Sequence, residues 1–176
     1  DRVLRIFCDI CYPDGRTFEG DSRNILKRSV DCLKELGYSC DIGSECKFYL
    51  FELDEYGNPT NKPHDNGTYY DVAPVDKGEN IRREICLTLE EMGIQPESSY
   101  HQAGPGQHEI VFKYGAPVEA ADHLMTFKNL VKTIAHMNGL FASFMPKPLQ
   151  RQNGNGIFVN LSLYDMDGNS VIDYNN

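Results

Sequence analysis

Three segments of the chain concentrate side chains that could bind cations, phosphates or carboxylates. The first, residues 43–47, reads G-S-E-C-K and places Glu45 and Lys47 two positions apart. Residues at that spacing on a strand project from the same face, so we expect these opposite charges to lie on the same side. The second, residues 97–109, is dense in His, Gln and Glu, and the third, residues 147–162, is rich in Asn and Gly. Glycines in such a segment let backbone amides approach a ligand closely.

The pattern of apolar residues predicts the elements that must position these segments. Helical spacing predicts three helices, at residues 22–36 behind a cap at Asp21 or Ser22, at residues 81–92 and at residues 117–137. Apolar runs predict strands at residues 3–10, 46–53, 97–101, 108–114, 140–145 and 157–164. Residues 54–78 are predicted to form a long loop or a hairpin with an excursion. Because strands come in adjacent pairs separated by helices, we predict an α+β fold, an antiparallel β-sheet with helices packed on one face.

The composition is that of a soluble globular protein and disfavours several other classes. Of 176 residues, 40% are hydrophobic and 24% are charged, and no apolar run is long enough to cross a membrane. Seventeen basic and 26 acidic residues give a net charge of −9 without a basic run, so we expect no nucleic-acid partner. The first ten residues lack the regions of a signal peptide, and we expect a cytoplasmic protein with its six cysteines reduced.

Two pairs of residues suggest chemistry that their context does not favour. Cys8 and Cys11 form a C-x-x-C pair, but residues three apart on a strand point to opposite faces, which makes a poor metal clamp. We therefore expect ordinary thiols there. His123 and His136 fall on the third predicted helix and are expected to be ordinary surface or core histidines.

The chain is similar to the bacterial type I form of the glutamine synthetase family. It contains several segments that resemble distinctive segments of this family, and they occur in the same order. Residues 18–23 resemble the start of the family's catalytic domain, and residues 43–48 resemble its G-x-E-x-E-F segment. Residues 69–85 resemble the stretch that follows, and P-G-Q-H-E at residues 105–109 resembles the family's hairpin. Residues 147–162 resemble the family's nucleotide-site signature.

This resemblance implies a glutamine synthetase catalytic-domain fold in incomplete form. We expect residues 1–176 to be a single partial catalytic domain, with residues 1–20 resembling the connection from an N-terminal β-domain that is absent. The family's enzymes are ATP-dependent ligases that join ammonia to glutamate with the help of two divalent cations. Their metal ligands in this stretch are the glutamates of G-x-E-x-E, H-H-E and G-Q-x-E and a histidine after the glycine-rich loop. A second histidine contacts the nucleotide phosphates.

The chain departs from the family at positions that hold the metals. Glu45 and Glu109 are retained as ligand-type residues. The replaced positions carry Lys47, Gln102 and Phe158 in place of metal ligands and Asn160 in place of the phosphate contact. Hard divalent cations prefer carboxylate oxygens, and these replacements supply none. We therefore expect Lys47 to form an ion pair with Glu45 or Glu109 where a cation would otherwise sit.

Other positions that the resemblance assigns to ligands are kept. Asn153 and Gly154 match the substrate-binding loop for glutamate, and Glu97 and Ser162 match nucleotide-binding positions. Our first hypothesis is a catalytically inactive glutamine synthetase-like domain, with a binding or regulatory role or as a remnant, without a cofactor and without catalytic residues. The alternative is a genuine glutamate–ammonia ligase family member present as a fragment, which retains nucleotide or glutamate binding and uses Mg or Mn and ATP. Self-association or a full-length synthetase is the expected partner, and no membrane is expected.

Overall fold

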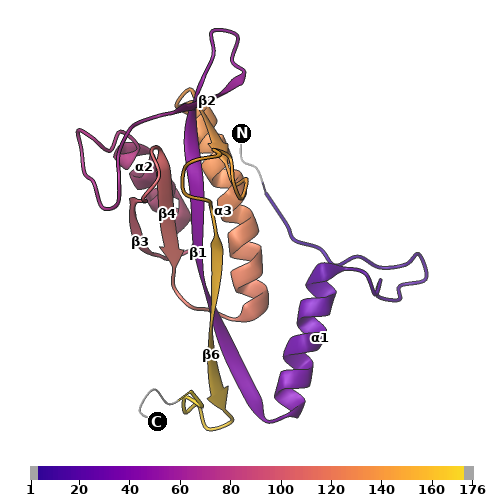
Figure 1. The fold of residues 1–176 in the computed structure, drawn as a ribbon. Coiled ribbons are helices and arrows are strands. Elements are labelled where there is room, and N and C mark those ends of the chain that lie inside the picture. The colour runs from indigo at the N-terminus through magenta and orange to yellow at the C-terminus, as the bar shows by residue number, and fades with distance from the viewer. Residues whose placement is uncertain (1–3, 173–176) are drawn as a thin grey trace. The chain divides into compact units, whose positions relative to one another are not determined.

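The computed structural model describes residues 4–172 and contains three helices and six strands within them (Figure 1). The helices are α1 (Ser22–Glu35), α2 (Glu79–Glu91) and α3 (Pro117–Met137). The strands are β1 (Tyr38–Leu53), β2 (Pro59–Pro63), β3 (Pro96–His101), β4 (Gln107–Phe112), β5 (Leu140–Ser143) and β6 (Ile157–Asp165).

The three helices and five of the six predicted strands form close to their predicted positions. Residues 54–78 contain β2, which pairs with β1, so this stretch is the hairpin with an excursion. The strand predicted at residues 3–10 is wrong for the residues that the structure describes, because they form no strand, while Val3 lies outside the described residues. Leu4 and Ile6 are 83% and 69% exposed, so the apolar pattern there has no sheet to join.

Residue contacts divide the chain into two compact units. The larger comprises residues 43–114 and 123–160, and the smaller holds the other described residues. In the smaller unit, α1 starts as predicted after Asp21, whose side chain accepts the N–H of Arg23. The helix ends before Gly37, which has a φ of +84° that favours glycine. The expectation of a single domain over residues 1–176 stays a prediction.

An antiparallel sheet lies at the centre of the larger unit. β1 pairs with β2, β4 and β5, and β3 pairs with β4, all antiparallel. Helices α2 and α3 contribute the other side of the hydrophobic core, which confirms the predicted fold class. The buried residues shared between sheet and helices include Cys46, Phe48, Leu50, Ile110 and Phe112 from the strands and Ile85, Leu89, Phe127 and Val131 from the helices.

The alternation of side chains along β1 separates this core from the predicted site. Cys46 and Phe48 point into the core, so Glu45 and Lys47 project from the opposite face of the sheet. The same holds on β4, where Ile110 faces the core and Glu109 faces away from it. The sheet therefore carries two chemically different faces.

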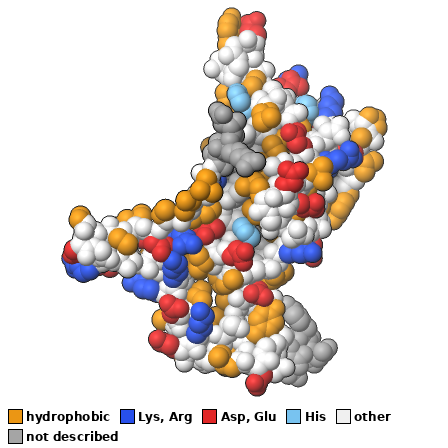
Figure 2. All heavy atoms as spheres, turned by 180° about the vertical axis from the view of Figure 1, so that it is seen from behind, with side chains coloured by type: hydrophobic (Ala, Val, Ile, Leu, Met, Phe, Trp, Pro, Cys, Tyr) orange, Lys and Arg blue, Asp and Glu red, His pale blue; other side chains and the backbone are white. Residues whose placement is uncertain are grey.

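Charges of both signs are spread over the surface of the described residues. On the face that Figure 2 shows, acidic and basic side chains are interspersed rather than gathered by sign. Among residues 4–172, no helix is both long and apolar enough to span a membrane. The expectation that no nucleic acid binds stays a prediction.

Candidate functional site

The strand register brings most of the predicted metal-site residues onto one face of the sheet. Lys47 lies directly opposite Glu109 across the β1–β4 pair, and Tyr100 lies opposite Glu109 on the other side, from β3. Glu45 is two positions from Lys47 on β1, without a bulge between them, which confirms that the two share a face. Residues far apart in the sequence are thus placed side by side.

Glu109 is buried, and two neutral side chains donate hydrogen bonds to one of its oxygens. The Tyr100 hydroxyl lies 2.9 Å from Oε2, and the Gln102 amide Nε2 lies 2.5 Å from the same atom. Burial and the hydrogen bond to Glu109 raise the pKa of Tyr100, so its hydroxyl remains a donor. The other oxygen, Oε1, has no hydrogen-bond partner among the described residues.

Glu45 is hydrogen-bonded by a second replaced position. The Asn160 amide Nδ2 donates to Glu45 Oε1 at 2.8 Å. Asn160 stands where the family resemblance places a histidine that contacts phosphate. Both retained glutamates therefore accept hydrogen bonds from neutral amides at replaced positions.

The predicted ion pair of Lys47 is wrong. Within the described residues its ammonium forms no ion pair with Glu45 or Glu109, and Nζ lies over the Phe158 ring, 4.8 Å from the centroid. An exposed cation–π contact of this kind contributes about 0.5–1 kcal/mol. Neutral amides already donate hydrogen bonds to both glutamates, and Lys47 instead contacts the ring of Phe158, the residue that replaces a histidine. Its charge still remains on the face that holds Glu109.

These residues do not fit a divalent cation. Mg²⁺ and Mn²⁺ take mostly oxygen ligands, and Mg²⁺ requires a near-octahedral set. Lys47 and Phe158 provide no oxygen, and the amide N–H groups of Gln102 and Asn160 point at the two carboxylates that a cation would need. Of the two Glu109 oxygens, Oε1 is the one that a cation could take without displacing a described hydrogen bond.

The glycine-rich loop is held against the sheet by its own backbone. The Tyr49 hydroxyl donates to the carbonyl oxygen of Asn153 at 2.6 Å, and Gln107 Nε2 donates to that of Gly154 at 3.0 Å. A Cβ at position 154 would lie 2.8 Å from the Pro146 carbonyl oxygen, so glycine is required there by the chain's own packing. The role of Asn153 and Gly154 in glutamate binding stays a prediction.

The two predicted nucleotide positions lie in different units. Glu97 is exposed on β3, where the register shifts between Pro96 and Ser98. Ser162 lies on the part of β6 that belongs to the smaller unit. Their role in binding nucleotide also stays a prediction.

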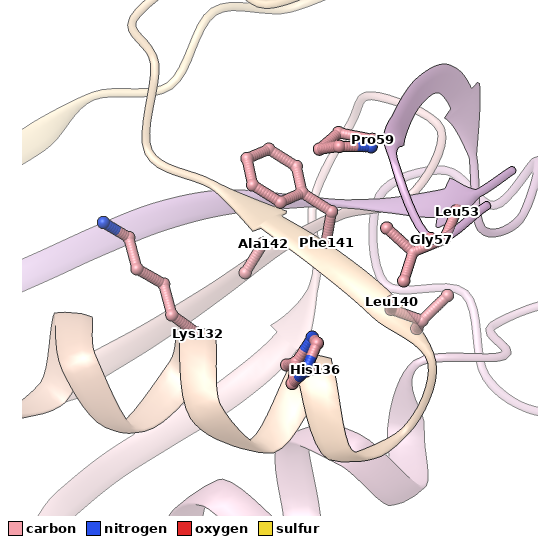
Figure 3. A pocket seen from close by; sticks show the side chains of 8 residues that line it. All are labelled: Leu53, Gly57, Pro59, Lys132, His136, Leu140, Phe141 and Ala142. Atoms are coloured by element: carbon pink, nitrogen blue, oxygen red, sulfur yellow. The ribbon is translucent and has the colours of Figure 1, made fainter.

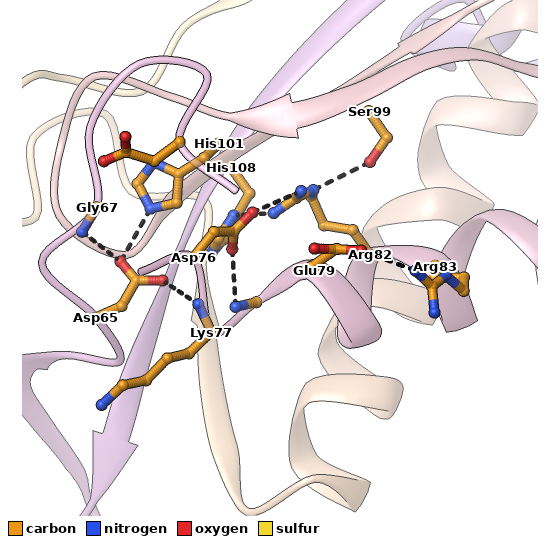
Figure 4. A network of polar contacts seen from close by, with 12 residues as sticks. Asp65, Gly67, Asp76, Lys77, Glu79, Arg82, Arg83, Ser99, His101 and His108 are labelled. Atoms are coloured by element: carbon orange, nitrogen blue, oxygen red, sulfur yellow. Dashed lines mark hydrogen bonds and ion pairs between the residues drawn. The ribbon is translucent and has the colours of Figure 1, made fainter. Parts of the chain in front are cut away.

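A second polar cluster, which the sequence analysis missed, is buried on the other face of the sheet (Figure 4). It consists of four residues of types that bind metals, Asp65, Asp76, His101 and His108, with one potential ligand atom from each lying within 4.8 Å of the others. Arg82 of α2 also takes part, through an ion pair of 2.7 Å with Asp76. The aspartates lie in the polar stretch that was predicted only as loop or hairpin, and the β3–β4 register brings the two histidines together.

The hydrogen bonds fix the charge on each histidine. His101 Nε2 lies 2.9 Å from Asp65 and its Nδ1 lies 2.6 Å from the carbonyl oxygen of Gln102, so both nitrogens face acceptors and the ring is a cation. Burial by itself would lower the pKa of His101, but the hydrogen bond and charge of Asp65 outweigh it and raise the pKa. His108 Nδ1 instead faces the Arg82 guanidinium, which can only donate, so this ring is neutral. Burial and the Arg82 charge lower the pKa of His108 well below its ordinary value.

The cluster is therefore balanced in charge without a metal ion. Two carboxylates face the guanidinium of Arg82 and the imidazolium of His101. A Cβ on Gly78 would lie 2.5 Å from His108 Nε2, so the ring is in close contact with the chain at the start of α2. Asp65 also accepts the backbone N–H groups of Gly67, Lys77 and Gly106. This arrangement fastens the segment between β2 and α2 to the β3–β4 hairpin.

Comparisons with known proteins identify the family of the chain. The family model "Glutamine synthetase, catalytic domain" matches residues 19–176. Glutamine synthetase of Clostridium saccharobutylicum is 51% identical over 174 residues, and that of Staphylococcus aureus is 49% identical over 175. Each match covers 99% of this chain and 39% of the relative, so the chain spans about two fifths of their length.

Solved structures, among them a glutamine synthetase, share the fold of this chain. Plasmodium falciparum glutamine synthetase matches with a TM-score of 0.83 and 28% identity, over 96% of this chain and 39% of that one. A complex of GmaS with ADP matches with a TM-score of 0.84 and 28% identity over the same shares. By the match of the family model to residues 19–176, the chain belongs to the glutamine synthetase family.

Proposed function

We propose that this chain is a glutamine synthetase-like domain that does not catalyse the family's ligation and instead has a binding or regulatory role, or is a remnant. One observation carries the proposal. The retained carboxylates, Glu45 and Glu109, accept hydrogen bonds from neutral amides at positions where the family resemblance places a phosphate contact and a metal ligand. No cofactor is expected in this case.

The chemistry of the family explains why this matters. Transfer of phosphate from ATP depends on cations that neutralise charge and hold the reacting groups in place. A hydrogen bond to a charged group contributes about 1.5–3 kcal/mol, and a cation at Glu45 Oε1 or Glu109 Oε2 would have to displace such bonds. Lys47 would in addition place a positive charge on the same face as the incoming metal.

The alternative is a genuine ATP-dependent glutamate–ammonia ligase family member present as a fragment, which retains nucleotide or glutamate binding with Mg or Mn. The unpartnered Oε1 of the buried Glu109 supports this alternative. A buried carboxylate oxygen without a partner is costly, and a cation would satisfy it.

Thermal-shift titration with Mg²⁺ or Mn²⁺ and ATP separates the two functions. We expect no metal-dependent rise in the unfolding midpoint of the natural chain. The combined variant Lys47→Glu, Gln102→Glu, Phe158→His and Asn160→His should gain one, with circular dichroism as the check that it folds. If metal and ATP raise the unfolding midpoint of the natural chain by several degrees and a chelator abolishes the rise, the proposal of an inactive domain is refuted.

Self-association or assembly with a full-length synthetase is the interaction that we propose for such a domain. Co-purification of the tagged chain with a full-length synthetase, or a dimer in size-exclusion chromatography, would support it. A free monomer under both conditions would count against it. A cytoplasmic location also stays a prediction, which fractionation of cells would test.

A further inference from the structure

A pocket lies in the larger unit, and neither polar cluster contributes to it (Figure 3). It has a volume of about 280 Å³ and is formed by the ends of β1 and β2, by β5 and by the C-terminal half of α3. Its lining includes Lys132 and His136 of α3 and Leu140, Phe141 and Ala142 of β5.

One side of the pocket is apolar. Leu140 and Ala142 are only 6% and 2% exposed, so the edge of the core forms its base. Phe141 is 40% exposed, and Figure 3 shows its ring on the side of β5 away from α3. An aromatic or branched hydrocarbon group could lose water against these side chains.

The other side carries the positive charge of Lys132 and the imidazole of His136. Lys132 and His136 are four residues apart on α3, so they lie on the same face of the helix, and both are exposed. None of the lining residues is acidic, and Lys132 has no ion pair with any residue that the structure describes. The net charge of −9 disfavours anions over the chain as a whole, but a lysine without an acidic neighbour in its pocket attracts an anion locally.

Two carbonyl groups at the end of α3 have hydrogen-bond donors of their own. The C-terminal carbonyls of a helix carry partial negative charge, which would repel an anion. Here the Asn138 side chain donates to the carbonyl oxygen of Ile134 at 2.9 Å, and the N–H of Gly139 donates to that of His136 at 3.0 Å. These carbonyls are therefore satisfied by donors of the chain itself.

We propose that this pocket binds a small carboxylate with an aromatic or branched hydrocarbon group. The carboxylate would lie at Lys132 and His136, and the hydrocarbon against Leu140 and Ala142, which belong to the core that α3 shares. The volume suits a ligand of about ten non-hydrogen atoms, slightly below the usual range for ligand pockets. An amine is disfavoured because no acidic side chain lines the pocket to accept it. This site does not depend on the proposed loss of metal binding.

Phenylacetate is a suitable probe, and its amine counterpart, 2-phenylethylamine, is the control ligand. In ¹H–¹⁵N NMR spectra of the labelled chain, phenylacetate should shift the amides of residues 132–142 with a dissociation constant in the millimolar range. Lys132→Gln should weaken binding about fivefold, as expected for one exposed charge pair.

Lys113→Gln is the matched control variant, because it removes the same charge from an exposed position of the same unit outside the pocket. It should leave the phenylacetate affinity unchanged. The proposal is overturned if phenylacetate causes no shift at these residues, if both lysine variants bind equally, or if 2-phenylethylamine binds as well as phenylacetate. Since Lys132 is exposed, its substitution is not expected to disturb folding.

Discussion

Replacement of Asp65 by Asn tests the buried cluster with the smallest change of shape. Asp65 accepts hydrogen bonds from His101 Nε2 at 2.9 Å and from three backbone N–H groups at 2.8–3.1 Å. An asparagine keeps one accepting oxygen but turns the other position into a donor. That donor would face the N–H of Lys77, which now lies 3.1 Å from Oδ2, and the imidazolium of His101 would lose its carboxylate.

The expected loss of stability follows from the burial of the pair. Both side chains are fully buried, and removal of one partner from a buried ion pair costs about 3–5 kcal/mol. Because His101 can release its proton once residue 65 is neutral, the loss should be about 3 kcal/mol, at the lower end of this range. For a chain of this length, 1 kcal/mol changes the unfolding midpoint by about 2–4 °C, so Asp65→Asn should lower it by about 6–12 °C.

The pH dependence gives a second, independent readout. The raised pKa of His101 means that its contribution is fully present below the unfolded value of about 6.5 and is lost as pH rises through the folded pKa. Burial alone would raise the pKa of Asp65, but the hydrogen bonds from His101 and the backbone outweigh it and lower the pKa. Its contribution is therefore present above about pH 4 and is lost as pH falls through the folded pKa. The pair should stabilise the chain most between about pH 4 and pH 6.5.

Thermal unfolding followed by circular dichroism at about pH 5.5 and pH 9 measures both effects. The difference in midpoint between the natural chain and Asp65→Asn should be larger at the lower pH. Asp71→Asn is the matched control, because Asp71 lies in the same segment and its side chain accepts one exposed backbone N–H. Equal unfolding midpoints for Asp65→Asn and the natural chain would refute a stabilising role of the Asp65–His101 pair. A difference in midpoint that is the same at both pH values would refute it as well.

Two further predictions concern the glycine-rich loop and the cysteines. Gly154→Ala should destabilise the chain by about 1–3 kcal/mol in urea unfolding, because the new Cβ would lie 2.8 Å from the Pro146 carbonyl oxygen. Gly156→Ala, whose Cβ would lie 3.6 Å from the Phe158 ring, should cost less, and equal losses would contradict this account of the loop. Burial raises the pKa of Cys46 to about 12, whereas Cys8 is exposed, so alkylation at about pH 8 followed by mass spectrometry should label Cys8 long before Cys46. Equal labelling rates in the folded chain would show that Cys46 is not protected.

The elements of the fold could be predicted because local signals determine them. Asp21 and Gly37 bound α1 through a side-chain cap and a left-handed φ, both of which are properties of single residues. The prediction of a strand at residues 3–10 was wrong because, although the apolar pattern is present, no described strand lies beside Leu4 and Ile6. Whether a strand pairs depends on the rest of the fold and not on its own residues.

The site could be predicted only in part, for a similar reason. Strand alternation was enough to place Glu45 and Lys47 on one face, and the register confirms it. The partner of Lys47 depends on which donors already occupy the glutamates, and the sequence does not show that Asn160 reaches Glu45 from 115 positions away. The cluster of Asp65 and His101 was missed because 36 residues separate the pair and no local motif marks it.

Direct titration of Mn²⁺ into the natural chain tests the central claim, with bound metal measured by the loss of the free-ion electron paramagnetic resonance signal. The replaced positions and the hydrogen bonds at Glu45 and Glu109 predict no binding at the metal concentrations that saturate the variant with the four ligand-type residues restored. Stoichiometric binding of Mn²⁺ by the natural chain, lost in Glu109→Gln, would contradict the account.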